Sequence, residues 1–171
     1  MMHGSGEITF FDGTVLSGTF SGNKLKSGTY SISTKEAEYT VKYKDFSIDT
    51  MNVTLNEGTT INGKFSDGAF NGEATVEYSN GDKYIGELVK NVKSGQGKYV
   101  WENGSYYDGQ WKNDTMNGKG TFVNSSDGTK LVGEFLDGVP DGKCTYYYQS
   151  DGKTKSCDTN WEKGKCVKVS E

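Results

Sequence analysis

Residues 84–105 read YIGELVKNVKSGQGKYVWENGS, and residues 107–130 read YDGQWKNDTMNGKGTFVNSSDGTK. Both segments open with tyrosine, place a glycine two residues later, and carry a Gly-x-Gly pair before a second aromatic residue. A pattern that recurs at a fixed distance is the mark of a repeat architecture, in which every unit forms the same small structure. This repeat therefore decides the fold.

The same pattern is found in residues 61–83 and 131–153, so four units follow one another. An earlier unit opens at Leu16, a degenerate unit covers residues 39–60, and partial units lie at both ends. We therefore expect one repeat domain over residues 1–171, with about five full units of about 23 residues. The first glycines of the four clear units are separated by 23, 23 and 24 residues, and they are Gly63, Gly86, Gly109 and Gly133.

Each unit is predicted to form a β-hairpin, because its large and small residues alternate with a period of two. Tyr84, Gly86 and Leu88 share one face of the first strand, and Gly97 and Tyr99 return in the same phase in the second. The predicted fold is all-β, an elongated single-layer antiparallel meander of successive hairpins in which the glycines permit close packing. Asn-Gly and Asp-Gly pairs, typical of type I′ turns, link the units; they are Asp12–Gly13, Asn80–Gly81, Asn103–Gly104, Asp127–Gly128 and Asp151–Gly152.

Charge and composition disfavour several partners. The net charge is −4, and all 19 basic residues are lysines, so the bidentate guanidinium that recognises phosphates and bases is missing. We therefore expect no nucleic-acid binding, and we expect binding to anionic lipid to be unlikely. No run of 18 apolar residues predicts a membrane helix, and the N-terminal residues do not form a secretory signal. The expected compartment is the cytoplasm.

No group of residues indicates catalysis, a cofactor or a metal site. The only histidine is His3, near the N-terminus. The Gly-x-Gly pairs do not precede a helical pattern, as a phosphate-binding loop would. Cys144, Cys157 and Cys166 contain no Cys-x-x-Cys pair, so free thiols are favoured, while a disulfide and a metal site stay open as alternatives. We expect a chain that is not an enzyme and holds no cofactor.

The segment Tyr107–Trp111, read with Gly118–Gly120, resembles the MORN repeat (membrane occupation and recognition nexus). The resemblance implies a solenoid-like sheet of β-hairpins and a non-catalytic role. Members of that family occur in junctional-membrane proteins, lipid kinases, cytoskeletal scaffolds and part of a lysine methyltransferase. This chain departs from the pattern where Cys144 replaces the second glycine of its unit, and where the unit opening at Tyr39 lacks the glycine pair.

A stripe of aromatic residues is the candidate functional site. A single-layer sheet has no second layer to cover such a stripe, so some rings are expected to stay accessible, and tyrosine and tryptophan are typical of binding hot spots. We expect a protein-interaction or scaffold module that binds a partner peptide or helix along this face. An accessory domain of a larger enzyme and a module for sugar or lipid head groups are the alternatives. The candidate residues are Tyr84, Tyr99, Trp101, Tyr107, Trp111, Phe122, Phe135, Tyr146, Tyr148 and Trp161.

The two ends of the predicted meander are exposed strand edges, which can pair with another chain. The C-terminal edge, Trp161–Val169, carries lysines that oppose such pairing. The N-terminal edge, Gly4–Phe10, has Glu7 as its only charge. Any self-association is therefore expected to use the N-terminal strand.

Overall fold

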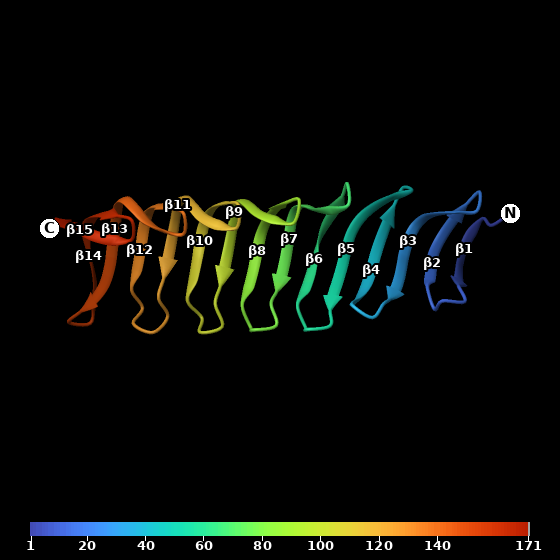
Figure 1. Cartoon of the computed structure of the whole chain (residues 1–171), viewed down its shortest axis with the longest axis horizontal. Coiled ribbons are helices and arrows are strands. Elements are labelled where there is room, and N and C mark those ends of the chain that lie inside the picture. The colour runs from blue at the N-terminus through green and yellow to red at the C-terminus, as the bar shows by residue number, and fades with distance from the viewer. Residues whose placement is uncertain (171) are drawn as a thin grey trace. The chain divides into compact units, whose positions relative to one another are not determined.

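The computed structural model describes residues 1–170, and within this range it contains β-strands and connecting turns but no helix (Figure 1). The chain divides into two compact units, Met1–Ser79 and Asn80–Glu171. In both units each strand pairs antiparallel with the next one in the chain. The prediction of an all-β antiparallel meander of hairpins is therefore confirmed, whereas the single domain over residues 1–171 stays a prediction.

The first unit contains seven strands within the described residues, coloured blue to green in Figure 1. Its buried apolar side chains include Phe20, Val41 and Phe70, which lie on one face of their strands. The strands are β1 (Gly4–Thr9), β2 (Val15–Ser21), β3 (Lys24–Ser33), β4 (Ala37–Lys44), β5 (Ser47–Leu55), β6 (Thr60–Ser66) and β7 (Ala69–Glu77).

The second unit contains eight strands within the described residues, coloured green to red. Tyr84 and Tyr107 are its most deeply buried large side chains, each with no exposed surface. The strands are β8 (Lys83–Val89), β9 (Val92–Val100), β10 (Tyr106–Lys112), β11 (Thr115–Val123), β12 (Lys130–Leu136), β13 (Val139–Ser150), β14 (Lys153–Glu162) and β15 (Lys165–Ser170).

A row of small residues crosses the sheet of the second unit. Gly86 pairs with Gly97, and Gly97 pairs in turn with Gly109, which faces Gly120. A Cβ added at Gly97 would lie 2.4 Å from the hydroxyl oxygen of Tyr84, so the tyrosine side chain fills the space above the glycines. This arrangement explains why the repeat tolerates glycine inside strands, where it otherwise lowers stability.

The two glycines of each Gly-x-Gly pair have different roles, which corrects the expectation that both serve close packing. The second glycine, such as Gly120, lies under a tyrosine ring. The first, such as Gly118, has a φ of 81° and lies next to a register shift between Gly109 and Trp111. A positive φ beside an irregular pairing is the geometry of a bulge, which glycine adopts without strain.

The turn assignment also needs a correction. Both central residues have a positive φ in the turns within the repeat units, for example at Asn113 and Asp114. At the Asn-Gly and Asp-Gly links only Asp151–Gly152 has this geometry; in the other four the glycine alone has a positive φ. Instead, the side chain of the first residue accepts a backbone hydrogen bond two residues on, as Asn103 Oδ1 does from Ser105 at 2.9 Å. These links are Asx-type turns, which use the same residues.

Candidate functional site

All ten candidate aromatic residues lie in the second unit, on strands β8–β14 and the turn after β9. The register places them on one face, because Tyr84, Tyr99, Tyr107 and Phe122 are direct cross-strand neighbours in one row. We call this surface the aromatic face. The spacing in the sequence therefore brings the candidate residues together as a group, whereas burial divides them into two classes.

Four of the ten residues are part of the packed interior: Tyr84, Tyr107, Trp111 and Phe135. The Tyr84 hydroxyl donates to the Glu87 carbonyl at 2.9 Å, and the Trp111 indole N–H donates to the Gly97 carbonyl at 2.9 Å. Burial raises the pKa of Tyr107 to about 12. Side chains that are enclosed and hydrogen-bonded in this way stabilise the fold and offer little surface to a partner.

The other six candidates are half-buried, and five of them form ring clusters with an accessible side. The Tyr99 and Trp101 rings lie 5.1 Å apart between centroids, and Trp101 lies 5.6 Å from Phe122. Tyr146 and Tyr148 are stacked at 5.9 Å. Together with Trp161, these residues are the part of the aromatic face that a partner can reach.

Lys93 is a residue of this face that the sequence reasoning missed. Its ammonium nitrogen lies 5.7 Å from the ring centroid of Tyr84, 5.0 Å from that of Tyr99 and 5.2 Å from that of Trp111. Asp114 Oδ1 is 4.0 Å away, and burial lowers the pKa of Lys93. The three rings form a cage around a cation, an arrangement that aromatic side chains stabilise through their negative faces.

Aligning the repeat units supplies the signal that would have identified Lys93. Lys93 pairs with Leu88, near the start of the second strand of its hairpin. At the matching position every other hairpin carries an apolar residue or cysteine, so one lysine stands out. These residues are Leu25, Ile48, Phe70, Met116, Pro140 and Cys166.

Asp82 supports the same cluster. It accepts hydrogen bonds from the Tyr99 hydroxyl at 2.6 Å and from the Glu102 backbone N–H at 2.9 Å. The bond from Tyr99 is the main reason that the pKa of Asp82 is lowered, and the positive charge of Lys93 lowers it further. Asp82 therefore stays ionised and holds the Tyr99 ring against the lysine.

A groove of about 340 Å³ opens on the aromatic face between β11 and β14. Four of its ten lining residues are candidate aromatic residues, and most of the other six are apolar. The groove is therefore suited to receive an apolar side chain. We call it the aromatic groove. Its lining residues are Met116, Phe122, Asn124, Thr129, Leu131, Phe135, Gly138, Pro140, Tyr146 and Trp161.

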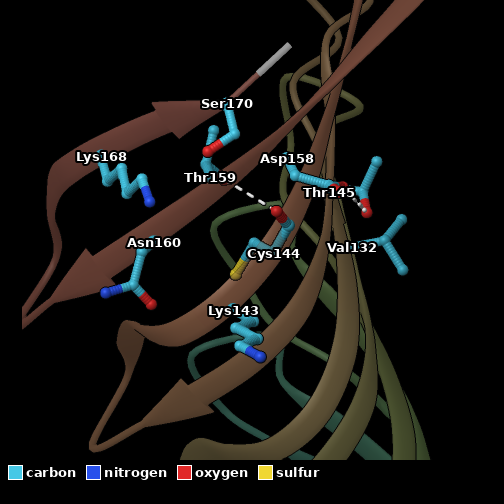
Figure 2. Close-up of a pocket in the computed structure, with 9 residues that line it drawn as sticks. All are labelled: Val132, Lys143, Cys144, Thr145, Asp158, Thr159, Asn160, Lys168 and Ser170. Atoms are coloured by element: carbon cyan, nitrogen blue, oxygen red, sulfur yellow. Dashed lines mark hydrogen bonds between the residues drawn. The ribbon is translucent and has the colours of Figure 1, made fainter.

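A second hollow of about 530 Å³ lies between strands β12 and β15 and has a polar lining (Figure 2). Lys143, Asn160 and Lys168 contribute to it, and the Thr159 hydroxyl donates to the Cys144 carbonyl at 2.9 Å. Burial raises the pKa of the Cys144 thiol, which opposes formation of a nucleophilic thiolate. This hollow contains no histidine and no pair of groups arranged for acid–base chemistry.

The cysteines and carboxylates of the described residues form no metal site. Cys144, Cys157 and Cys166 are free thiols in the structure. Within residues 1–170 no three histidine, cysteine, aspartate or glutamate side chains lie close enough to hold a metal ion together. In the same range no helix is long and apolar enough to cross a membrane.

Comparison with known proteins identifies the repeat. The family model for the MORN repeat matches residues 1–15, 62–83, 84–106, 107–129 and 132–153, more than half of the chain. A search of curated proteins gives no match. Four of the matched segments cover the hairpins β6–β7, β8–β9, β10–β11 and β12–β13. The chain belongs to the MORN-repeat family.

Proposed function

We propose that the chain is a protein-interaction module that binds a partner peptide or helix along the aromatic face of its second unit. MORN repeats are generally modules for protein or lipid interaction. The observation that carries the proposal is the aromatic groove, about 340 Å³ in volume and walled by the half-buried rings of Phe122, Tyr146 and Trp161. Partly exposed tryptophan and tyrosine next to an apolar pocket are typical anchors of protein interfaces.

The role that we propose is non-catalytic. The sole histidine, His3, lies in the exposed N-terminal segment, before β1 begins its regular pairing. Asp82, whose pKa is shifted, accepts hydrogen bonds from Tyr99 and Glu102 and so supports the packed rings. Lys93, the other charged residue of the cluster, is enclosed by those rings. Asp82 and Lys93, whose pKa values are shifted, therefore have contacts that support a role in packing the face.

The experiment is an affinity capture with mass spectrometry that compares two adjacent tyrosines on β13. Tyr146 lines the aromatic groove, whereas Tyr147 points to the opposite face, where Lys130 lies 4.2 Å from its ring centroid. Both side chains are half-buried. We expect Tyr146→Ala to lose the captured protein and Tyr147→Ala to keep it. Equal capture by both variants would contradict the proposal.

Trp111→Ala is unsuitable for this experiment, although Trp111 was a candidate binding residue. Its ring is 7% exposed and contacts both Tyr84 and Tyr107. Replacing a buried aromatic residue with alanine costs about 3–5 kcal/mol of stability, so loss of capture would report unfolding. Trp161, on β14 and half-buried, is the better tryptophan for testing the face.

Self-association through the N-terminal strand remains a proposal of its own. β1 pairs with β2 and is the first strand of its unit. Phe11, in the turn after β1, is fully exposed, and Phe10 is 46% exposed. β15 also exposes Val167 and Val169. The C-terminal edge therefore has apolar surface in addition to the lysines noted in its sequence. Ile8→Lys should lower the sedimentation coefficient of any assembly if β1 is the contact, and an unchanged coefficient would contradict it.

A further inference from the structure

The aromatic groove belongs to a series of three equivalent boxes, each with three walls. In each box a pair of residues directly opposite each other in the register forms two walls, and a large ring opposite the bulge glycine forms the third. The first box has walls Tyr84, Tyr99 and Trp111; the second has Tyr107, Phe122 and Phe135; the third has Leu131, Tyr146 and Trp161.

The register also assigns one residue to the interior of each box. Lys93, Met116 and Pro140 occupy the same position in the three hairpins, because they pair with Leu88, Trp111 and Phe135 respectively. Lys93 fills the first box with its ammonium group. Methionine is long and flexible enough to fill the second.

The third box differs because its interior residue is short. The side chain of proline is a ring closed onto its own backbone, so Pro140 cannot extend between the walls. All four residues of the third box line the aromatic groove: Leu131, Pro140, Tyr146 and Trp161. The groove also extends to Met116, Phe122 and Phe135 of the second box, so it is the space around the shorter Leu131 and Pro140 between the larger side chains of both boxes.

Charge separates the first box from the third. Two carboxylates act on Lys93 in the first box, those of Asp114 and Asp82. No charged residue lines the aromatic groove, whose polar lining side chains are those of Asn124 and Thr129. A buried ammonium without a carboxylate is costly. The groove is therefore complementary to a neutral apolar group and not to a cation.

We propose that the third box receives a neutral apolar side chain from a partner polypeptide, in the place that Met116 takes in the second box. This inference rests on the proposed function and adds the chemistry of the partner. The groove volume of about 340 Å³ corresponds to roughly ten water molecules at about 30 Å³ each, so it has room for two apolar side chains of one segment. The amide of Asn124 and the hydroxyl of Thr129 at the rim are suited to hydrogen bonds with peptide groups.

The test is selection of peptides from a random 12-residue display library on the full chain. We expect selected sequences to share two leucine, methionine or phenylalanine residues and to show no enrichment of lysine or arginine. A synthetic peptide of the consensus sequence should then bind with an affinity that changes less than twofold between low and high salt. A consensus rich in lysine or arginine, or binding that weakens strongly with salt, would overturn the proposal.

Pro140→Met is the decisive variant, because it places the side chain of the second box into the third. We expect it to weaken binding of the consensus peptide at least tenfold. Lys93→Met is the matched control, since it introduces the same residue at the equivalent position of a box that is already full, and it should alter binding less than twofold. Unchanged binding to Pro140→Met, or equal loss in both variants, would overturn the inference.

A second measurement keeps the test valid if Pro140→Met folds poorly. In the unaltered chain, the peptide should shift the indole N–H resonance of Trp161 and leave that of buried Trp111 in place. A shift of Trp111 alone would overturn the inference. Phosphatidylcholine vesicles that displace the peptide, or a dimer that Pro140→Met dissociates, would assign the groove to lipid or to a second copy and overturn it as well.

The failure of this inference is distinguishable from the failure of the proposed function. If the selected peptides lose binding with Tyr146→Ala but are cationic or insensitive to Pro140→Met, the aromatic face binds a partner and the assigned chemistry is wrong. If the library yields no peptide sensitive to Tyr146→Ala, both the proposed function and the inference are wrong.

Discussion

The β8–β9 and β12–β13 hairpins share one backbone plan but fill their interior in different ways. In β8–β9 a large side chain, Tyr84, covers two glycines, so that a Cβ added at Gly97 would lie 2.4 Å from the tyrosine hydroxyl oxygen. In β12–β13 the covering residue is the shorter Leu131, and the second glycine has become Cys144. The Cys144 sulfur lies 2.4 Å from a Cβ added at Gly133, so it occupies the equivalent space.

Cys144 occupies part of the space that Tyr84 fills in β8–β9, and its thiol also points to the backbone carbonyl equivalent to the one that accepts from the Tyr84 hydroxyl. The Tyr84 hydroxyl donates to the Glu87 carbonyl, and the Cys144 thiol points to the carbonyl of Glu134, the matching residue, at 3.8 Å. Leu131 and Cys144 therefore share the space that one tyrosine ring fills in β8–β9, and we expect substitutions at the two positions to be coupled. The comparison also shows that a repeat can keep its fold while one hairpin, through Pro140, leaves its box open.

The largest effect is expected from a side chain introduced into the glycine row. A Cβ at Gly109 would lie 2.5 Å from the Cα of Gly120 and 2.7 Å from the Tyr107 hydroxyl oxygen, so Gly109→Val must displace backbone. We expect it to lower the free energy of unfolding by about 2 kcal/mol or more, measured by urea denaturation.

Gly6→Val is the control, because Gly6 also lies in a strand and a Cβ there would meet only the end of Met2, at 3.9 Å. Its free energy of unfolding should stay within about 0.5 kcal/mol of the unaltered chain. A Gly109→Val variant with an unchanged urea midpoint would show that the row has room for side chains.

The next effect tests whether Leu131 and Cys144 form one unit. Leu131→Tyr alone introduces a ring where the sulfur lies, and Cys144→Gly alone leaves a cavity, so both should destabilise. The double variant recreates the pair found in β8–β9, and it should recover about 1–2 kcal/mol relative to the sum of the single changes. Additive urea-denaturation energies would mean that the two positions are independent.

The fold was predictable from the sequence because the same strand and turn pattern recurs in several repeat units. The period of two and the 23-residue spacing locate the strands, and the rows that join Gly86 to Gly120 follow from aligning the units. The turns were harder, since Asn-Gly pairs suit both type I′ and Asx-type turns, and only the pairing of the flanking strands distinguishes them.

The candidate site was predictable as a face but not in its details. Alternation places Tyr107 and Tyr146 on one surface, but full burial of the first and partial exposure of the second depend on neighbouring strands. Lys93 resembles a solvent-exposed strand lysine until the units are aligned. The aromatic groove lies where Leu131 and Pro140 stand among larger rings, and a cavity of this kind is a property of three-dimensional packing.

A smaller effect on stability is expected from removing the tyrosine hydroxyl, which donates a hydrogen bond in the hairpins that a tyrosine covers. The Tyr107 hydroxyl donates to the Gln110 carbonyl at 3.0 Å, so Tyr107→Phe should cost about 1 kcal/mol near neutral pH. The fold raises the pKa of Tyr107 to about 12, above its ordinary value of 10. The unfolded chain therefore loses its proton first, and the advantage of the tyrosine should fall as pH rises from 10 to 12. Urea titrations at pH 8 and 11 measure this, and a constant difference would contradict it.

The smallest effect is expected from converting the first box to the type of the second. Lys93→Met exchanges cation–π contacts and the ion pair with Asp114 for apolar packing, and such exchanges are often close to neutral. We expect the free energy of unfolding to change by less than about 1 kcal/mol at pH 7. Burial lowers the pKa of Lys93 in the fold, so the unfolded chain binds more protons between that lowered pKa and the ordinary value of 10.5. The unaltered chain should therefore gain stability relative to Lys93→Met as pH rises through this window.

The matched control for this variant is Lys98→Met, on the same strand but on the opposite face, where the lysine lies 4.0 Å from the Tyr106 ring centroid. Because that ammonium is not enclosed by three rings, its removal should give no comparable dependence on pH. Urea midpoints of the three proteins at pH 7 and pH 10 make the comparison. The opposite pH dependence would result if the attraction between the lysine and its cage exceeded the cost of burial. The unaltered chain would then lose stability relative to Lys93→Met as pH rises. In that case the first box would be a cation site that stabilises the fold, and the contrast with the uncharged third box would be larger than burial alone indicates.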